Sequence, residues 1–258
     1  MDIITTFPHI ALEATPSTNL YLSQLCQREG ERVLPFTTVT ADYQSAGKGQ
    51  RGNSWESEAG KNLLFSFVTY PTHLKARQQF LISQLVSLAI QETLSQWSDE
   101  ISIKWPNDIY WREKKICGIL IENDLNGSQI ARSISGIGLN INQTHFVSDA
   151  PNPISLRQIT GQEHDRLAIL EEVMQRMMDA FHQAEMEPYE SYSTTIANRY
   201  QRVLFRREGY HPYVDAQGDF LARLLRVEPD GRFVLEDEQG DVREYLFKEV
   251  QYQLCPHG

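Results

Sequence analysis

The sequence predicts an α+β protein with a large first domain and a small second domain rich in strands. Up to residue 202, segments with apolar residues at helical spacing are interspersed with strand-like segments. After Leu204 the pattern changes to short strands separated by turn residues. A chain of 258 residues with 41% apolar residues can bury a core in both parts. We therefore expect a first domain over residues 1–202 and a small, barrel-like β domain over residues 203–258.

The first domain is expected to begin with a strand, a helix and two further strands. The opening strand ends before Ser17 or Thr18, either of which can cap a helix over residues 19–28. An extended segment over residues 36–43 leads into a glycine-rich loop. The apolar and aromatic residues 62–70 form a buried strand after that loop. The loop therefore connects two strands.

The limits of the later elements follow from apolar spacing and turn residues. Ile101, Ile103 and Trp105 share one face of a strand, which leaves Lys104 on the other face. The remaining expected elements are an amphipathic helix over 73–97, strands over 116–122 and 130–142, helices over 166–185 and 188–202, and short strands over 203–214, 219–227, 232–236 and 242–247.

The glycine-rich loop, residues 44–55, combines three glycines with cations and a tryptophan. Glycines can turn backbone N–H groups inward, and a concave run of N–H groups binds anions. Lys48 and Arg51 add full positive charges, and Trp55 offers a flat apolar face for a base. The alternative is a surface loop whose charges are only solvated.

The context of these glycines excludes two common nucleotide-binding folds. Gly47, Gly49 and Gly52 have the spacing of the dinucleotide fingerprint, which requires a helix directly after the third glycine. Here a strand follows instead, so a Rossmann site is excluded. A protein-kinase loop does lie between strands, but the chain lacks the accompanying His-Arg-Asp and Asp-Phe-Gly motifs. The sequence therefore indicates an anion-binding loop of another kind.

Two further segments place lysines beside apolar strands. Lys104 precedes a Trp-Pro-Asn-Asp sequence in which Asn107 and Asp108 favour a turn, although an exposed lysine beside a simple turn is the alternative. Lys115 opens a strand that is otherwise apolar, and Gly118 within it indicates close approach of a ligand or another backbone. The next strand contains two glycines, which indicate either the same kind of surface or a bulge.

Composition excludes several classes of protein. A formal net charge of −10 argues against broad binding to nucleic acid or anionic membranes. The start of the chain lacks a secretory signal, and no apolar run is long enough to suggest a membrane span. Cys26, Cys117 and Cys255 fit reduced thiols of a cytoplasmic protein, with Cys117 packed in a core. The histidines show no metal-binding spacing.

Four motifs, in order, resemble the catalytic domain of the biotin protein ligases. They are the glycine loop at 47–55, Lys-Trp-Pro-Asn-Asp at 104–108, Lys-Ile-Cys-Gly-Ile-Leu-Ile-Glu at 115–122 and Gly-Ile-Gly-Leu-Asn at 136–140. The resemblance covers most of residues 10–145. It implies a mixed β-sheet flanked by helices, followed by an SH3-like C-terminal barrel. It also implies biotin and MgATP as substrates, and a lysine of a biotin carboxyl carrier domain as acceptor.

The resemblance implies roles for individual residues. The implied catalytic residues are Lys115, Lys104 and Arg51. The implied biotin site comprises Ser17, Thr18, Asn19, Gln44, Gly47, Lys48, Lys115, Gly118 and Gly136. The implied ATP and adenylate site comprises Lys48, Gln50, Arg51, Trp55, Lys104, Asn107 and Asn140. Asn107 and Asp108 are the candidates for positioning magnesium or the incoming amine, and Trp55 could instead attach its loop to the core.

These residue types suit the implied reaction. The carboxylate of biotin must approach the α-phosphate of ATP, and cations and N–H donors offset the repulsion between the two anions. The product, biotinyl-5′-AMP, is reactive enough for a lysine amine to attack it without an enzyme nucleophile. The absence of a Ser/His/Asp or Cys/His set from the motifs is therefore expected, and catalysis depends on positioning and charge.

Two other functions remain as alternatives. A lipoate protein ligase shares this architecture and chemistry, but the complete glycine loop with Trp55 and the Lys-Trp-Pro-Asn-Asp sequence favour biotin. A non-catalytic biotin- or nucleotide-binding module would not need lysines crowded around a carboxylate. Some family members carry a helix-turn-helix repressor domain, but about ten residues precede the match here. We therefore expect no DNA binding.

The loop departs from the family pattern at one position, and this generates a prediction. Family members often have Gly-Arg-Gly-Arg at the loop start, whereas this chain has Gly47-Lys48-Gly49-Gln50. Gln50→Arg should decrease the release of adenylate and the non-specific biotinylation of bystander proteins several-fold, because it adds a charge that holds the phosphate. The alternative is that Arg51 and Lys48 compensate for Gln50, and equal leakage from both proteins, measured by adenylate release, would then contradict the prediction.

Overall fold

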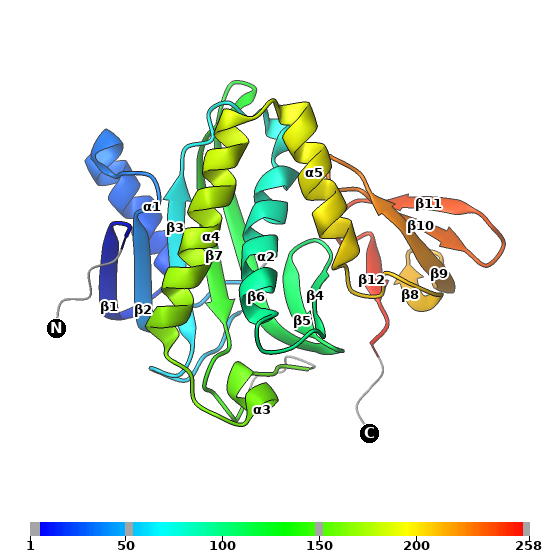
Figure 1. The fold of residues 1–258 in the computed structure, drawn as a ribbon, viewed down its shortest axis with the longest axis horizontal. Coiled ribbons are helices and arrows are strands. Elements are labelled where there is room, and N and C mark those ends of the chain that lie inside the picture. Colours follow the sequence, from blue (N-terminus) through cyan, green and yellow to red (C-terminus); the bar gives the residue numbers. More distant parts are fainter. Residues whose placement is uncertain (1–5, 50–53, 148–151, 255–258) are drawn as a thin grey trace.

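The computed structural model describes residues 6–49, 54–147 and 152–254, and its largest element is a seven-stranded mixed sheet (Figure 1). In order across the sheet, the strands are β1 (His9–Thr15), β2 (Thr38–Gln44), β3 (Leu63–Thr69), β7 (Gln129–Leu139), β6 (Lys114–Asn126), β5 (Asp108–Trp111) and β4 (Ile101–Lys104). β1 and β2 pair in parallel, and the other neighbours pair antiparallel. The two longest strands, β6 and β7, lie together near the centre. The predicted motifs at 115–122 and 136–140 therefore come from adjacent strands.

Helices cover both faces of this sheet. They are α1 (Thr18–Glu29), α2 (Phe80–Leu94), α3 (Leu156–Thr160), α4 (Arg166–Met186) and α5 (Tyr189–Arg202), with short 3-10 segments at Gly30–Arg32 and Ala76–Gln78. α2, α4 and α5 lie together on one face, whereas α1 packs against β2, β3 and β7 on the other (Figure 1). α1 is short, so it leaves part of that second face open.

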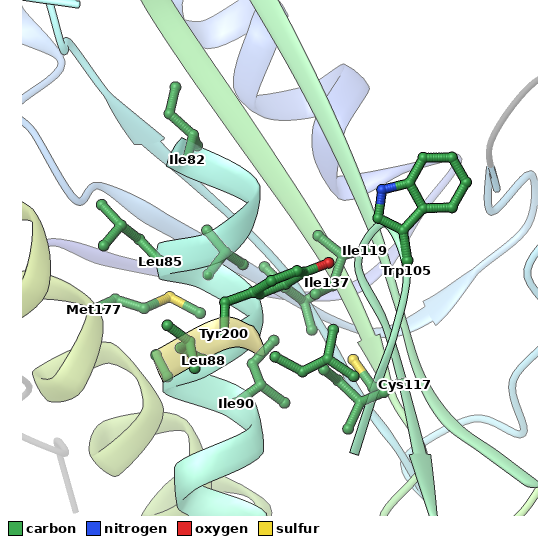
Figure 2. Packing of buried hydrophobic residues seen from close by; sticks show 14 of the residues in the cluster. Ile82, Leu85, Leu88, Ile90, Trp105, Cys117, Ile119, Ile137, Met177 and Tyr200 are labelled. Atoms are coloured by element: carbon green, nitrogen blue, oxygen red, sulfur yellow. The ribbon is translucent and has the colours of Figure 1, made fainter. Parts of the chain in front are cut away.

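The main core lies between the sheet and α2, α4 and α5. Figure 2 shows Leu85 and Leu88 of α2 packed beside Met177 of α4, with Ile119 and Ile137 of the sheet opposite them. Thirteen residues of α2 are buried, because the helix lies between the sheet and two other helices. Side chains alternate along a strand, so the neighbours of Ile119 and Ile137 face the opposite side of the sheet.

A second sheet follows the helices. Its order is β11 (Val242–Tyr245), β10 (Phe233–Asp237), β9 (Gly218–Val227), β8 (His211–Asp215) and β12 (Val250–Tyr252), and its pairs are antiparallel. Trp105 stacks on Phe233 at 4.8 Å between ring centroids, and its Nε1 donates to the carbonyl of Gly231 at 2.9 Å. The small sheet is therefore attached to the segment that carries Lys104.

Most predicted elements are confirmed, with differences at the ends. The helix expected over 73–97 consists of the Ala76–Gln78 segment and α2. The strand expected over 203–214 is wrong in its first half, because β8 begins only at His211. Val203 instead accepts a hydrogen bond from Ile103 N at 2.8 Å, and Phe205 donates to Ile103 O at 2.8 Å, so this apolar run lies along the edge strand β4. α3 and β12 were not expected, and a domain boundary at residue 203 stays a prediction.

Two further expectations concern cysteines and membranes. Cys117 is completely buried, as predicted, and Cys26 is buried on the face of α1 that packs against the sheet, whereas Cys255 lies outside the described residues. None of the helices within the described ranges has the length and apolar character needed to cross a membrane.

Candidate active site

One cavity of about 840 Å³ brings most of the predicted site residues together. It lies on the sheet face that α1 leaves open, between the glycine loop, strands β4 to β7 and the turn after β11. The predicted residues in its wall are Ser17, Thr18, Asn19, Gln44, Lys48, Trp55, Lys104, Asn107, Asp108, Lys115, Gly118, Gly136 and Asn140. Gly47 lies next to the cavity through its contact with Trp55. Gln50 and Arg51 lie outside the described residues.

A bulge between β5 and β6 aims Lys115 into the cavity. Ile109 pairs with Cys117 but Tyr110 pairs with Lys115, so Ile116 is an extra residue in β6. The bulge allows both Ile116 and Cys117 to be buried in the core, while Lys115 and the residue after Cys117 face the opening. A single register without the bulge would place Lys115 and Cys117 on the same face of the strand.

The ammonium of Lys115 is paired across the same hairpin. Its Nζ lies 2.8 Å from Asp108 Oδ2, and both side chains are about one quarter exposed, at 29% and 26%. The Lys115 backbone N–H donates to Asn152 O at 2.8 Å, which fixes the start of β6. The carboxylate therefore balances the charge of the lysine in the free protein, and an anionic ligand entering the cavity would compete for the same ammonium.

Lys104 lies deeper, between aromatic rings of both sheets. It is opposite Asp108 in the β4–β5 pair, and its neighbour Ile103 points into the core, as predicted. The Lys104 Nζ lies 5.2 Å from the ring centre of Tyr110 and 4.8 Å from that of Tyr252. Burial lowers the pKa of Lys104, and the neighbouring Lys115 lowers it further while Asp108 raises it. The small sheet, through Tyr252, thus forms one wall around this lysine.

The glycines of β6 and β7 accommodate Trp55. Gly118 and Gly138 face each other across the strand pair, and a Cβ on them would lie 2.8 Å and 2.4 Å from atoms of the Trp55 ring. The close approach indicated by the sequence is therefore made by a side chain of the same protein. Trp55 N also donates to Gly47 O at 2.9 Å, which closes the described ends of the glycine loop. Stacking of Trp55 on adenine stays a prediction.

A polar network forms the end of the cavity next to α1. Asn19 lies against Gly136, where a Cβ would come within 2.0 Å of Asn19 Oδ1. Its Nδ2 donates to Glu122 Oε2 at 2.8 Å, and the Ser66 hydroxyl lies 2.6 Å from its Oδ1. The Thr18 N–H donates to Gln44 Oε1 at 2.7 Å. Thr18 and Gln44 are thus held in place by the protein before a ligand arrives.

The two asparagines assigned to the nucleotide are both buried. Asn140 Oδ1 accepts from Asn62 Nδ2 at 3.3 Å, and Asn140 Nδ2 donates to Ile154 O at 3.1 Å. Asn107 Nδ2 donates to Ile119 O at 3.4 Å. Both side chains therefore support the walls of the cavity in this structure, and their contacts with ATP stay predictions.

The residues near Asp108 fit only a magnesium ion that arrives with phosphates. Within the described part of the chain, no three Asp, Glu, His or Cys side chains form a group that could hold a metal alone. Asp108 supplies one carboxylate at the cavity wall. Magnesium is commonly bound by one or two carboxylates together with substrate phosphates. The donor set therefore fits a nucleotide-bound ion rather than a resident metal.

Sequence reasoning missed several residues of the site. Tyr110, Phe247 and Lys248 line the cavity, and Ser66 and Glu122 hold Asn19. Ser66 left a signal, because it is a polar residue within an apolar strand run. Nothing in the sequence indicates Phe247 and Lys248 as site residues, since they reach the cavity only because the small sheet docks beside it.

Comparison with known proteins agrees with this geometry. A family model described as "Biotin/lipoate A/B protein ligase family" matches residues 12–140. The chain is 27% identical to the "Bifunctional ligase/repressor BirA" of Bacillus subtilis (strain 168) over 252 residues, which are 92% of this chain and 71% of that protein. It is 30% identical to the protein of the same name from Escherichia coli (strain K12) over 232 residues, 85% of this chain and 69% of that protein.

A solved structure extends the comparison to the fold. The "Biotin protein ligase from Aquifex aeolicus in complex with biotin and ATP" matches with a TM-score of 0.75 and 25% identity. The match covers 96% of this chain and 99% of that chain, so it includes the small sheet. The predicted combination of a mixed sheet with helices and a C-terminal β unit is confirmed.

The packing of Trp55 on glycine generates a prediction. Gly138→Ala should lower the free energy of unfolding by about 1–3 kcal/mol, because the new methyl group overlaps the Trp55 ring. In a Trp55→Ala background the same substitution should cost much less, because the overlapping ring is gone. Urea unfolding of the four proteins measures the coupling, and equal costs in both backgrounds would contradict the contact.

Proposed function

Because the chain belongs to the biotin/lipoate A/B protein ligase family, we propose that it is a biotin protein ligase. In this proposal, the enzyme activates biotin with MgATP and transfers it to a lysine of a biotin carboxyl carrier domain in the cytoplasm. The observation that carries the proposal is one cavity whose wall includes Lys104, Lys115 and the described ends of the glycine loop beside a polar, neutral end. The carrier domain follows from the family resemblance alone.

The first step joins two anions, and the cavity supplies the opposing charge. A carboxylate oxygen of biotin attacks the α-phosphorus of ATP, the bond to the β-phosphate oxygen breaks, and pyrophosphate leaves. Lys115 is assigned to the carboxylate and α-phosphate, and Lys104 to the phosphates. Both ammonium groups are partly withdrawn from water, where they stabilise developing negative charge more strongly than in solution. Magnesium, bound with ATP beside Asp108, would neutralise further phosphate charge.

In the second step the enzyme contributes mainly by positioning the two reactants, because the adenylate is already reactive. The amine of the acceptor lysine attacks the carbonyl carbon of biotinyl-5′-AMP and loses a proton. The bond to the phosphate oxygen breaks and AMP leaves. The enzyme contributes by holding the adenylate and excluding water, and Trp55 covers the part of the sheet where the adenylate would lie.

The polar end of the cavity favours biotin over lipoate. Thr18, Gln44 and Asn19 present hydrogen-bonding groups there. A ureido ring can satisfy such groups, whereas the dithiolane ring of lipoate would leave them unpaired, at a cost of about 1–3 kcal/mol each. A purely binding module is disfavoured because Lys104 and Lys115 are held beside each other at a site for a carboxylate.

The proposal predicts biotin-dependent exchange of pyrophosphate into ATP that depends on Lys115. Lys115→Ala should lower the exchange rate by about 100-fold or more, because it removes a charge aimed at the reacting groups. Lys114→Ala is the matched control, since this neighbouring lysine does not line the cavity. Circular dichroism verifies the fold of both variants. Exchange with lipoate but not biotin, or full activity of Lys115→Ala, would overturn the assignment.

The buried position of Lys104 predicts an alkaline decline in activity. A lysine with a lowered pKa loses its charge as pH rises through that lowered value, so kcat/KM for ATP should fall at a lower pH than an ordinary lysine would cause. Lys104→Arg keeps its charge throughout this range and should remove the decline, even if its maximal rate is lower. Lys114→Arg should leave the profile unchanged. An unchanged decline in Lys104→Arg would show that another group titrates.

A further inference from the structure

The polar end of the cavity is a chain of hydrogen bonds that runs to an exposed carboxylate. Glu122 binds Asn19 Nδ2 at 2.8 Å from the outer end of β6. Asn19 Oδ1 lies 2.6 Å from the hydroxyl of Ser66, and that hydroxyl lies 2.7 Å from Thr18 Oγ1. Thr18 lies next to Gln44 in the cavity wall. Ser66 is fully buried, so its hydrogen bonds must be made within the protein.

The direction of each hydrogen bond follows from the carboxylate. Glu122 can only accept, so the amide of Asn19 must turn its NH₂ group toward Glu122 and its oxygen toward Ser66. The single hydroxyl proton of Ser66 is then donated to Asn19 Oδ1. Because Ser66 has no second proton, the 2.7 Å contact between Ser66 and Thr18 needs the Thr18 proton, which is then used here rather than in the longer 3.1 Å contact with Gln44 Oε1.

This order fixes what the cavity offers a ligand. The only hydroxyl proton of Thr18 is used inside the protein, so Thr18 Oγ1 can present only lone pairs to the cavity. Gln44 Oε1 already accepts the Thr18 N–H at 2.7 Å, and the Nε2 group of that amide has no hydrogen-bond acceptor among the described residues. The cavity wall therefore presents the hydroxyl oxygen of Thr18 as an acceptor beside the amide Nε2 of Gln44 as a donor.

We propose that Glu122 and Ser66 are specificity-determining residues that make this end of the cavity selective for a ring with adjacent N–H and C=O groups. The proposal rests on the proposed function, in which the ureido ring of biotin occupies this end. The ring N–H donates to Thr18 and the ring carbonyl accepts from Gln44. A ring with oxygen in place of that N–H would place two sets of lone pairs against each other.

The test compares biotin with its two carbamate analogues, in which an oxygen replaces one or the other ureido N–H. Pyrophosphate exchange by the wild-type protein should be about 100-fold less efficient with one of these analogues than with biotin. In Ser66→Ala, the Thr18 hydroxyl loses its short-range acceptor and can turn to donate to the ring oxygen. Its remaining contact, with Gln44 Oε1, is longer at 3.1 Å. In Ser66→Ala, exchange with that analogue should therefore be less than about tenfold less efficient than exchange with biotin.

Glu122→Gln gives a second variant, because glutamine can either donate or accept and no longer fixes the Asn19 amide. In Glu122→Gln, the loss of exchange efficiency with that carbamate analogue relative to biotin should lie between the losses in the wild-type protein and in Ser66→Ala. Asp124→Asn is the matched control, since it removes another carboxylate from β6 that pairs with Arg132 instead. Desthiobiotin keeps both ureido N–H groups, so the ratio of its efficiency to that of biotin should not change in any variant.

The outcomes separate the two proposals. If Ser66→Ala and Glu122→Gln lower exchange with biotin, desthiobiotin and the carbamates by one common factor, the network has only a structural role and the inference is wrong. An unchanged carbamate penalty in both variants would overturn it equally. If the wild-type protein forms no adenylate from biotin at all, the proposed function fails, and the inference that rests on it fails with it.

Discussion

The structure depends on the absence of side chains at three glycines of the central strands. Gly136 admits Asn19, and Gly118 with Gly138 admits the ring of Trp55. Any larger residue would overlap these groups at less than 3 Å. Because α1 and the glycine loop both use this surface, the sheet can bring residues from the start of the chain against β6 and β7. The cavity exists because these glycines leave the middle of that sheet face without side chains, next to the second core that α1 forms with the sheet.

Electrostatics explains why the two lysines can lie in one cavity of an acidic protein. Two ammonium groups withdrawn from water repel each other, and burial disfavours the charge of Lys104. Asp108 reduces this cost because it pairs directly with Lys115 and lies opposite Lys104 in the sheet. The aromatic faces of Tyr110 and Tyr252 also attract the Lys104 charge. Among the described residues, the cavity wall still carries more lysines (Lys48, Lys104, Lys115 and Lys248) than carboxylates (Glu56 and Asp108), so an incoming pair of anions would meet a positively charged site.

The sequence predicts the local features of the site better than its contacts. Alternation along Ile101 to Lys104 correctly placed Lys104 on the face away from the core, and glycine within β6 correctly indicated a close approach. The partner in that approach could not be predicted, because Trp55 is far from Gly138 in the chain. Tyr252 and Phe247 were missed for the same reason, since only the stacking of Trp105 on Phe233 brings the second sheet to the cavity. The run after Arg202 was misread because Val203 and Phe205 have strand-like side chains but bond to β4 as a connecting segment.

The two ends of the cavity differ in a way that constrains the ligand's shape. Thr18 and Gln44 form a neutral end, with the buried Ser66 behind Thr18, whereas Lys115 and Lys104 form a charged end. Between them the sheet offers glycine backbone and the face of an indole, which suit a short apolar segment. Neutral hydrogen bonds discriminate through unpaired groups, and the lysines attract any anion without much regard to its shape. Under the proposed function, selectivity for the acid to be activated therefore has to come from the neutral end, whereas the charged end supplies the chemistry.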